Sequence, residues 1–152
     1  MDALIVHEVR PDDARLAPLI DAHLSHSSVH SPDTSCHTMT AAELIAEPGL
    51  RMWLAELGDV PVACGALKPL AVDAEVKSVH VAETARGRGA ARAIMEAIAG
   101  AARASGVTAL YLETGSGTSC KATMRRGGYI MRWGSGPARR SKAMWRIPPA
   151  ST

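Results

Sequence analysis

The sequence predicts a mixed α/β (α+β) fold, in which a mostly antiparallel central sheet is covered by helices on both faces. Strand-like and helix-like segments follow one another in the order β-α-α-β-β-β-α-β-α-β-β. Gly58 and Asp59 separate two strand-like segments, which predicts an antiparallel hairpin. A long helical segment separates residues 74–81 from residues 107–113, which predicts two parallel neighbouring strands joined by a right-handed crossover.

The N-terminal part is expected to hold a strand, a helix and a loop. Residues 3–9 are rich in β-branched side chains and predict the first strand. Pro11 and the acids after it predict the start of a helix, since proline and negative charge are both tolerated in a first helical turn. Apolar residues recur at helical spacing as far as Leu24. The polar residues 25–38 are then expected to form a loop.

Local signals mark the ends of the remaining elements. Thr40 and Glu43 fit a capping box at the start of a short helix. Gly106 is expected just past the end of the long helix, where glycine is common. The expected strands are 51–57, 60–67, 74–81, 107–113, 129–133 and 143–147, and the expected helices are 88–105 and 119–126.

Length and composition limit the class of protein. The chain has 152 residues, of which 47% are hydrophobic, so we expect one domain over residues 1–152 with a core of its own. It contains no apolar run of about 18 residues, which argues against a membrane span. Its N-terminus lacks the basic start and apolar stretch of a secretory signal. Three scattered cysteines do not make a disulfide framework, and a reducing cytoplasm is the simplest interpretation.

Charge is distributed unevenly along the chain. Residues 1–113 hold nine basic and fifteen acidic side chains, a net charge of −6, whereas residues 114–152 hold eight basic and no acidic ones, a net charge of +8. A basic tail of this kind can bind nucleic acid or an acidic partner. The tail shows no zinc finger or helix-turn-helix pattern. We therefore expect a solvated basic face rather than a nucleic-acid partner.

The turn before the long helix has the composition of an anion site. Arg86, Gly87, Arg88 and Gly89 stand between a strand and a helix. The first amides of a helix lack intrahelical partners, and the helix dipole places partial positive charge at the same end. The glycines allow the backbone to approach a ligand closely, and the arginines add charge. A phosphate group is the expected ligand, and a tight solvated connection is the alternative.

This turn has the form Arg-x-x-Gly-x-Ala at Arg86, Gly89 and Ala91, after a strand that ends V-x-V. It resembles the acetyl-CoA-binding motif of the GNAT superfamily of N-acetyltransferases, in its small bacterial type. The strings C-G-A-L-K, E-V-K-S-V and L-E-T-G, which begin at residues 64, 75 and 112, are similar to strands of the same proteins. The resemblance covers about residues 3–117, and residues 117–152 are atypical.

The resemblance implies an acetyl transfer from acetyl-CoA to a primary amine, by direct attack in a ternary complex. It implies that the strands at 76 and 107 splay apart at their ends, that the acceptor is a small molecule or a peptide amine, and that a homodimer can form. Backbone groups of Val79, His80 and Val81 would pair with the pantetheine arm of the cofactor. The pyrophosphate would be held by Arg86, Gly87, Arg88, Gly89, Ala90 and Ala91.

Acetyl transfer needs a base for the amine proton and a donor for the oxyanion. Glu75 is the first candidate for the base, acting through water, and a solvated acid at the end of a strand is its alternative. Glu113 is the second candidate. His80 could be catalytic or could be a half-buried structural histidine. A strand amide near Val81 would stabilise the oxyanion.

One position departs from the family pattern. GNAT proteins usually carry a tyrosine that protonates the leaving thiolate, and Met124 stands at that position here. Methionine cannot donate a proton, and Cys120 is a candidate replacement. A non-catalytic acyl-CoA-binding module that has lost its acid is therefore the alternative function. A frameshift in the gene would explain the atypical tail and remains a second hypothesis.

Three histidines suggest a metal site that their surroundings do not complete. His23, His26 and His30 have the spacing of one helix face. No nearby acid or cysteine fills the coordination shell. A histidine cluster in an acceptor-binding loop is the favoured interpretation, and no metal is expected.

Overall fold

The protein is described by a computed structural model that covers residues 2–30, 38–114 and 141–146. Among these residues six strands form a single sheet in the order β1-β2-β3-β4-β5-β6. Every neighbouring pair is antiparallel except β4 and β5, which are parallel. The strands are β1 (Leu4–Val9), β2 (Arg51–Leu57), β3 (Val60–Pro69), β4 (Ala74–Val81), β5 (Ala109–Thr114) and β6 (Ser141–Arg146). The predicted mixed, mostly antiparallel sheet is confirmed.

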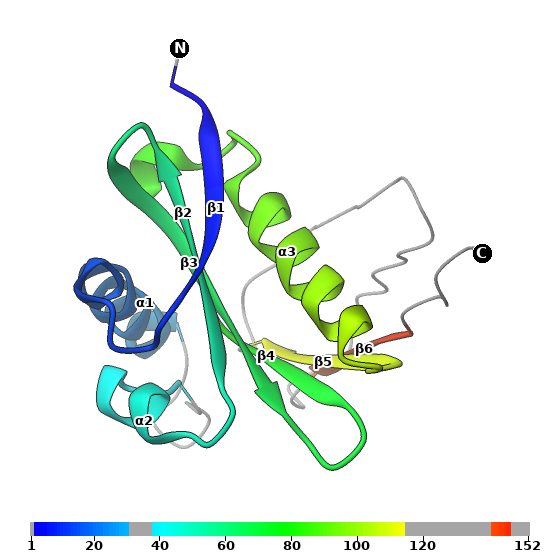
Figure 1. Cartoon of the computed structure of the whole chain (residues 1–152). Helices are drawn as coiled ribbons and strands as arrows, with labels where there is room; N and C mark the ends of the chain where they lie inside the picture. The colour runs from blue at the N-terminus through cyan, green and yellow to red at the C-terminus, as the bar shows by residue number, and fades with distance from the viewer. Residues whose placement is uncertain (1, 31–37, 115–140, 147–152) are drawn as a thin grey trace.

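Helices cover both faces of this sheet (Figure 1). The helical elements are η1 (Ala14–Leu16), α1 (Ala17–His30), α2 (Ala41–Ala46), η2 (Glu83–Ala85) and α3 (Ala90–Ala104). One core lies between the sheet and α3, and it includes Trp53, Val76, Ile94 and Ile98. The other core lies on the opposite face against α1 and α2, and it includes Ile20.

Strand alternation explains how one sheet serves two cores. Met52 and Leu54 belong to the core under α1 and α2, whereas Trp53 and Ala55 belong to the core under α3. Successive side chains of a strand point to opposite faces. Because both faces are covered, β2 is apolar almost throughout rather than alternating with polar residues.

Gly65 lets α3 approach β3 closely. A Cβ atom built at Gly65 would lie 2.6 Å from Ile94 Cγ2 and 3.0 Å from Ile98 Cδ1. Distances this short mean that any side chain would push the helix away from the sheet. The sequence interpretation gave Gly65 no packing role, because the close approach exists only after the helix has docked.

Helix α1 differs from its prediction at both ends. It begins at Ala17 rather than at Pro11, because Asp13 instead caps the short helix η1 through the amide of Arg15. It continues to His30, so residues 25–30 are helical and the predicted loop at 25–38 was wrong there. Packing of α1 against β3 and β4 explains this, since tertiary contacts outweigh the weak helix propensity of serine and histidine.

The other element boundaries agree closely with their predictions. The Thr40–Glu43 capping box is present, with both of its hydrogen bonds formed. Helix α3 begins two residues later than predicted, because Gly89 has the left-handed φ of 81°. Ala91, in the first turn of this helix, is exposed. The helix and strand predicted at 119–126 and 129–133 lie outside the described residues.

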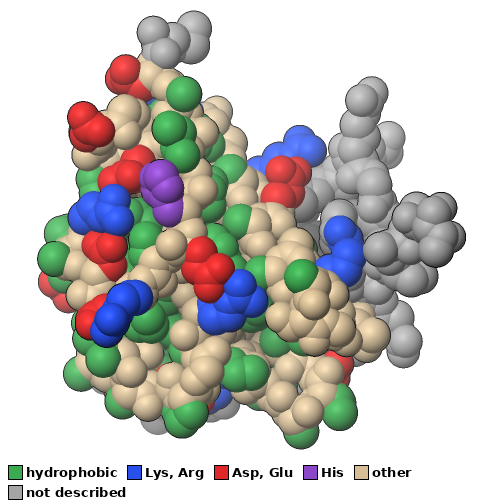
Figure 2. Space-filling view, viewed as in Figure 1, with side chains coloured by type: hydrophobic (Ala, Val, Ile, Leu, Met, Phe, Trp, Pro, Cys, Tyr) green, Lys and Arg blue, Asp and Glu red, His purple; other side chains and the backbone are tan. Residues whose placement is uncertain are grey.

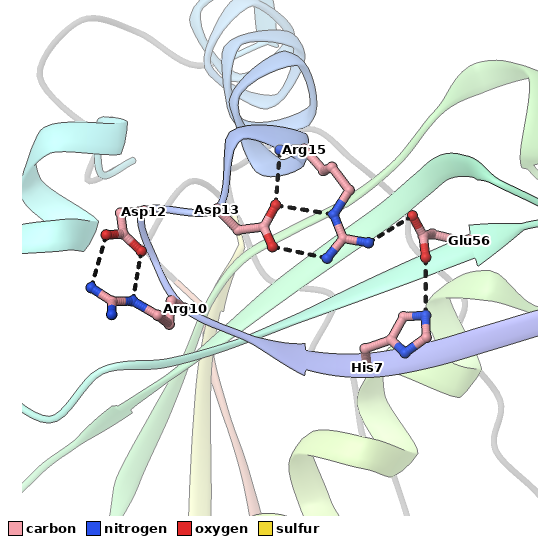
Figure 3. Close-up of polar contacts among 6 residues, drawn as sticks. All are labelled: His7, Arg10, Asp12, Asp13, Arg15 and Glu56. Atoms are coloured by element: carbon pink, nitrogen blue, oxygen red, sulfur yellow. Dashed lines mark hydrogen bonds and ion pairs between the residues drawn. The ribbon is translucent and has the colours of Figure 1, made fainter.

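An ion-pair network connects η1, which leads into α1, to the edge of the sheet (Figure 3). Arg15 donates to Asp13 at 2.9 Å and to Glu56 at 3.0 Å. Nε2 of His7 lies 2.9 Å from the other carboxylate oxygen of Glu56. Glu56 is only 8% exposed. The hydrogen bonds from Arg15 lower the pKa of Asp13 to about 2. On the same face, acidic and basic side chains are interspersed (Figure 2).

Candidate active site

The turn before α3 is open and is shaped by two glycines. Gly87 and Gly89 have φ angles of 76° and 81°, in the left-handed region that favours glycine. A Cβ atom at either position would meet no described residue within 4 Å, so this part of the structure leaves space beside the backbone. The turn is exposed, and both Arg86 and Arg88 lie on its surface.

The first amides of α3 point out of this turn. Gly89 is the N-cap, and no side chain caps it. The amide of Ala93 donates to the carbonyl of Gly89 and closes the first helical turn. The amides of Ala90, Ala91 and Arg92 precede that bond and are left for an external acceptor. Together with the dipole of α3 they make an anion site that fits a phosphate group.

Strands β4 and β5 pair only near the beginning of β4. Their ladder runs from the Ala74–Leu110 pair to the Val76–Leu112 pair. Strand β4 then continues to Val81 with its other edge still bonded to β3. Among the described residues, the edge of β4 that faces β5 is therefore unpaired beyond Val76, and an extended ligand can bind there as an added strand. This edge leads from the anion site to the point where the two strands separate (Figure 1).

A β-bulge lies where β4 leaves β5. Cys64 pairs with His80 and Ala66 pairs with Lys77, so Ser78 and Val79 together oppose Gly65. Ser78 has a φ of 53°, which is rare for a residue with a side chain. Its hydroxyl is buried and has no hydrogen-bond partner among the described residues. This bulge was not predicted, because alternation along a single strand does not indicate a change of register with its neighbour.

Glu75 lies on the face of the sheet that carries α1 and α2. Val76 packs into the core under α3, so its neighbours Glu75 and Lys77 point the other way. Their side chains form an ion pair of 3.2 Å and are only 16% and 15% exposed. An open pocket of about 520 Å³ lies on this face, and its lining residues are Thr38, Met39, Glu43, Ala46, Glu47, Lys68 and Lys77.

His80 lies on the same face and contacts α1. Its ring meets the ring of His23 edge to face, with 5.7 Å between the centroids. Burial lowers the pKa of His80, and the nearby charge of Arg86 lowers it further. Burial lowers the pKa of His23 to about 4, with smaller effects from His80 and His26. Both imidazoles are therefore neutral near pH 7.

Cys64 is poorly suited to carry an acetyl group. Its thiol is buried and donates to the carbonyl of Ser78 at 3.5 Å. Burial raises the pKa of the Cys64 thiol to about 12, whereas a nucleophilic cysteine needs a thiolate.

Several candidate residues from the sequence lie outside the part of the chain that the structure describes. Cys120, Met124 and the frameshift hypothesis fall on residues that the structure does not describe, as does the side chain of Glu113. Among the described residues, no group of three or more His, Cys, Asp or Glu side chains could hold a metal ion. Within the same residues, no helix has the length and apolarity needed to cross a bilayer.

Comparison with known proteins identifies the family. The family model described as "Acetyltransferase (GNAT) family" matches residues 19–123. The chain belongs to this family. It is 32% identical over 103 residues to the "Uncharacterized N-acetyltransferase YsnE" of Bacillus subtilis, a match that spans 67% of this chain and 68% of that protein. It is 37% identical over 101 residues to the "IAA acetyltransferase" of Azospirillum brasilense, spanning 62% of this chain and 64% of the relative.

Solved structures agree with the GNAT fold. A Klebsiella pneumoniae protein described as an acyl-CoA N-acyltransferase has a TM-score of 0.65 and 21% identity, covering 95% of this chain and 97% of the other. Other proteins of the same fold were solved with CoA bound. The chain is thus a GNAT acetyltransferase, and acetyl-CoA is its co-substrate. The open glycine turn and the unpaired edge of β4 fit that molecule.

Proposed function

We propose that the protein transfers an acetyl group from acetyl-CoA directly to a primary amine, within a ternary complex. The observation that carries this proposal is the unpaired edge of β4, which leads from the N-terminus of α3 to the separation of β4 and β5. That edge offers a continuous backbone surface to an extended ligand that is negatively charged at one end.

The proposed cofactor contacts follow this surface. Backbone amides from Arg86 to Ala91 bind the pyrophosphate, and Arg86 and Arg88 add charge-assisted contacts. The backbone of Val79, His80 and Val81 pairs with the pantetheine arm. The bound acetyl group then lies near the bulge, where no described strand pairs with β4 on the β5 side.

The proposed chemistry uses groups on the α1/α2 face of β4. Glu75 accepts the amine proton through a water molecule, while the amine nitrogen bonds to the acetyl carbon. The carbon–sulfur bond then breaks, and CoA leaves as a thiolate that takes a proton from water. A backbone amide near Val81 stabilises the developing negative charge on the carbonyl oxygen. The buried, protonated Cys64 supports direct transfer, because it is unfit to form an acyl-enzyme.

The decisive experiment is acetyl-CoA binding by calorimetry, followed by thiol release with a panel of amines. The wild type should bind acetyl-CoA and release thiol only when an amine acceptor is present. Binding without release from any amine would favour the non-catalytic alternative. Initial rates should give intersecting rather than parallel double-reciprocal lines, as direct transfer requires.

A matched pair of variants tests the anion site. Gly89→Glu places a bulky negative side chain in the turn and should abolish acetyl-CoA binding. Gly100→Glu adds the same side chain to an exposed, open position farther along α3 and should bind like the wild type. Normal binding by Gly89→Glu would overturn the assignment. A Gly89→Ala variant separates the backbone effect of losing glycine from the effect of charge.

A further inference from the structure

Four charged residues of alternating sign line or border the open pocket. Lys68 forms an ion pair of 3.2 Å with Glu47 of the segment that follows α2. Lys68 is also the cross-strand partner of Glu75, and Glu75 pairs with Lys77 at 3.2 Å. We call Glu47, Lys68, Glu75 and Lys77 the charged row. It extends from α2 to the place where β4 and β5 separate.

The two lysines of the charged row have N–H donors that their ion pairs do not use. Lys77 is 15% exposed and Lys68 is 29% exposed, so water reaches them only in part. Each makes one ion pair with an acid among the described residues. An ammonium group carries three N–H donors, and a partly buried donor without an acceptor is costly. Because both lysines line the pocket, their remaining donors are available to an anionic group within it.

The acidic side chains near the pocket differ in the contacts that they already make. Glu43 binds the amide of Thr40 as part of the capping box of α2, so its carboxylate is already used. Glu75 does not itself line the pocket, but it borders it through Lys77 and is the proposed base for the amine. The pocket thus presents lysine donors beside a carboxylate that is near the proposed acetyl position.

We infer that the acceptor is a zwitterion, an amino acid or a compound of that class, whose carboxylate binds Lys68 and Lys77 while its amine faces Glu75. The inference rests on the proposed acetyltransferase function and names its substrate class. An amine without a carboxylate would leave the remaining donors of both lysines without an acceptor, and the positive charge of such an amine would be repelled by Lys68 and Lys77. A zwitterion matches both signs of charge in the row.

Matched acceptors test this inference. Each amino acid in a panel is compared with the amine that remains when its carboxyl group is removed, so that side chain and amine stay the same. The wild type should show a kcat/KM at least tenfold higher for at least one amino acid than for its decarboxylated partner. Equal values throughout, or a preference for the decarboxylated amines, would overturn the inference.

Variants of the lysines make the test specific. Lys77→Met and Lys68→Met keep the length of the side chain and remove its charge. Each should raise KM for the preferred amino acid at least tenfold and change KM for the decarboxylated amine less than twofold. Equal effects on both acceptors would overturn the inference. Arg10→Met removes an exposed cation of another ion pair, and it should leave both KM values unchanged.

Two controls separate this inference from the function on which it rests. Thermal denaturation shows whether each variant is folded, and calorimetry shows whether it binds acetyl-CoA like the wild type. If the wild type acetylates amines without regard to the carboxylate, only the zwitterion inference fails. If the wild type neither binds acetyl-CoA nor acetylates any amine, the proposed function fails and the inference fails with it.

Discussion

At the level of single residues, Glu75 and His80 are the candidate catalytic residues whose side chains the structure describes, and they differ in their surroundings. Glu75 is ion-paired to Lys77 and borders the open pocket. His80 packs against the ring of His23 on α1, and burial lowers its pKa. Glu75 therefore has the better position for taking the amine proton.

The first prediction concerns Glu75. Glu75→Gln should lower kcat by about 10²- to 10⁴-fold, the usual contribution of a general base, while the Kd for acetyl-CoA stays within twofold. His80→Gln should lower kcat much less. Steady-state kinetics and calorimetry measure the two effects. A larger loss in His80→Gln than in Glu75→Gln would exchange the two roles.

Ser78 gives a prediction on stability. Its left-handed φ and its buried hydroxyl without a partner both cost free energy in the folded state. Glycine adopts this φ readily and removes the hydroxyl. Ser78→Gly should therefore raise the free energy of unfolding by about 1 kcal/mol, as measured by urea denaturation. Ser78→Ala keeps the unfavourable φ and should gain less. A destabilised Ser78→Gly would show that the bulge depends on the serine.

At the level of elements, α1 and β4 meet through the rings of His23 and His80. Burial lowers the pKa of His23 to about 4 in the folded protein, from an ordinary value of 6.5. The unfolded chain therefore binds more protons between these pH values, and stability falls as pH falls. The groups that lower its pKa, after burial, are His80 and His26, and Arg86 acts on His80.

The corresponding prediction is a stability profile with pH. The contribution of His23 to the free energy of unfolding should be complete above about pH 6.5. From the size of the pKa shift, the free energy of unfolding should fall by up to about 3 kcal/mol as the pH falls to about 4. His23→Gln should flatten the profile over this interval, because glutamine does not titrate there. Urea denaturation at several pH values measures the profile. Equal slopes in the wild type and in His23→Gln would contradict the assigned pKa.

The elements also show which features the sequence could predict. The bounds of β4, the hairpin and the capping box depend on neighbouring residues, and local patterns identified them. The bulge at Ser78 and the close approach at Gly65 depend on contacts between β3, β4 and α3, which alternation along one strand does not encode. The same limit applies to the charged row, since Glu47, Lys68 and Lys77 meet only in the folded sheet.

At the level of the whole molecule, the proposed ligand joins parts that are distant in sequence. The proposed anion site lies at the start of α3, and the free edge belongs to β4. The charged row includes the segment after α2. A ligand that binds only the folded state stabilises the entire chain, because unfolding must first release it. Acetyl-CoA should therefore raise the thermal stability of the protein as a whole.

The last prediction is the size of that effect. At a free concentration of about 100 times its Kd, acetyl-CoA should add about 2.7 kcal/mol to the free energy of unfolding. For a chain of 152 residues this corresponds to a rise in Tm of roughly 5–10 °C. Gly89→Glu should show no rise and Gly100→Glu the full one, since only the first blocks the anion site. A rise of equal size in both variants would place acetyl-CoA elsewhere on the protein, because the free amides of α3 could not then be its binding site.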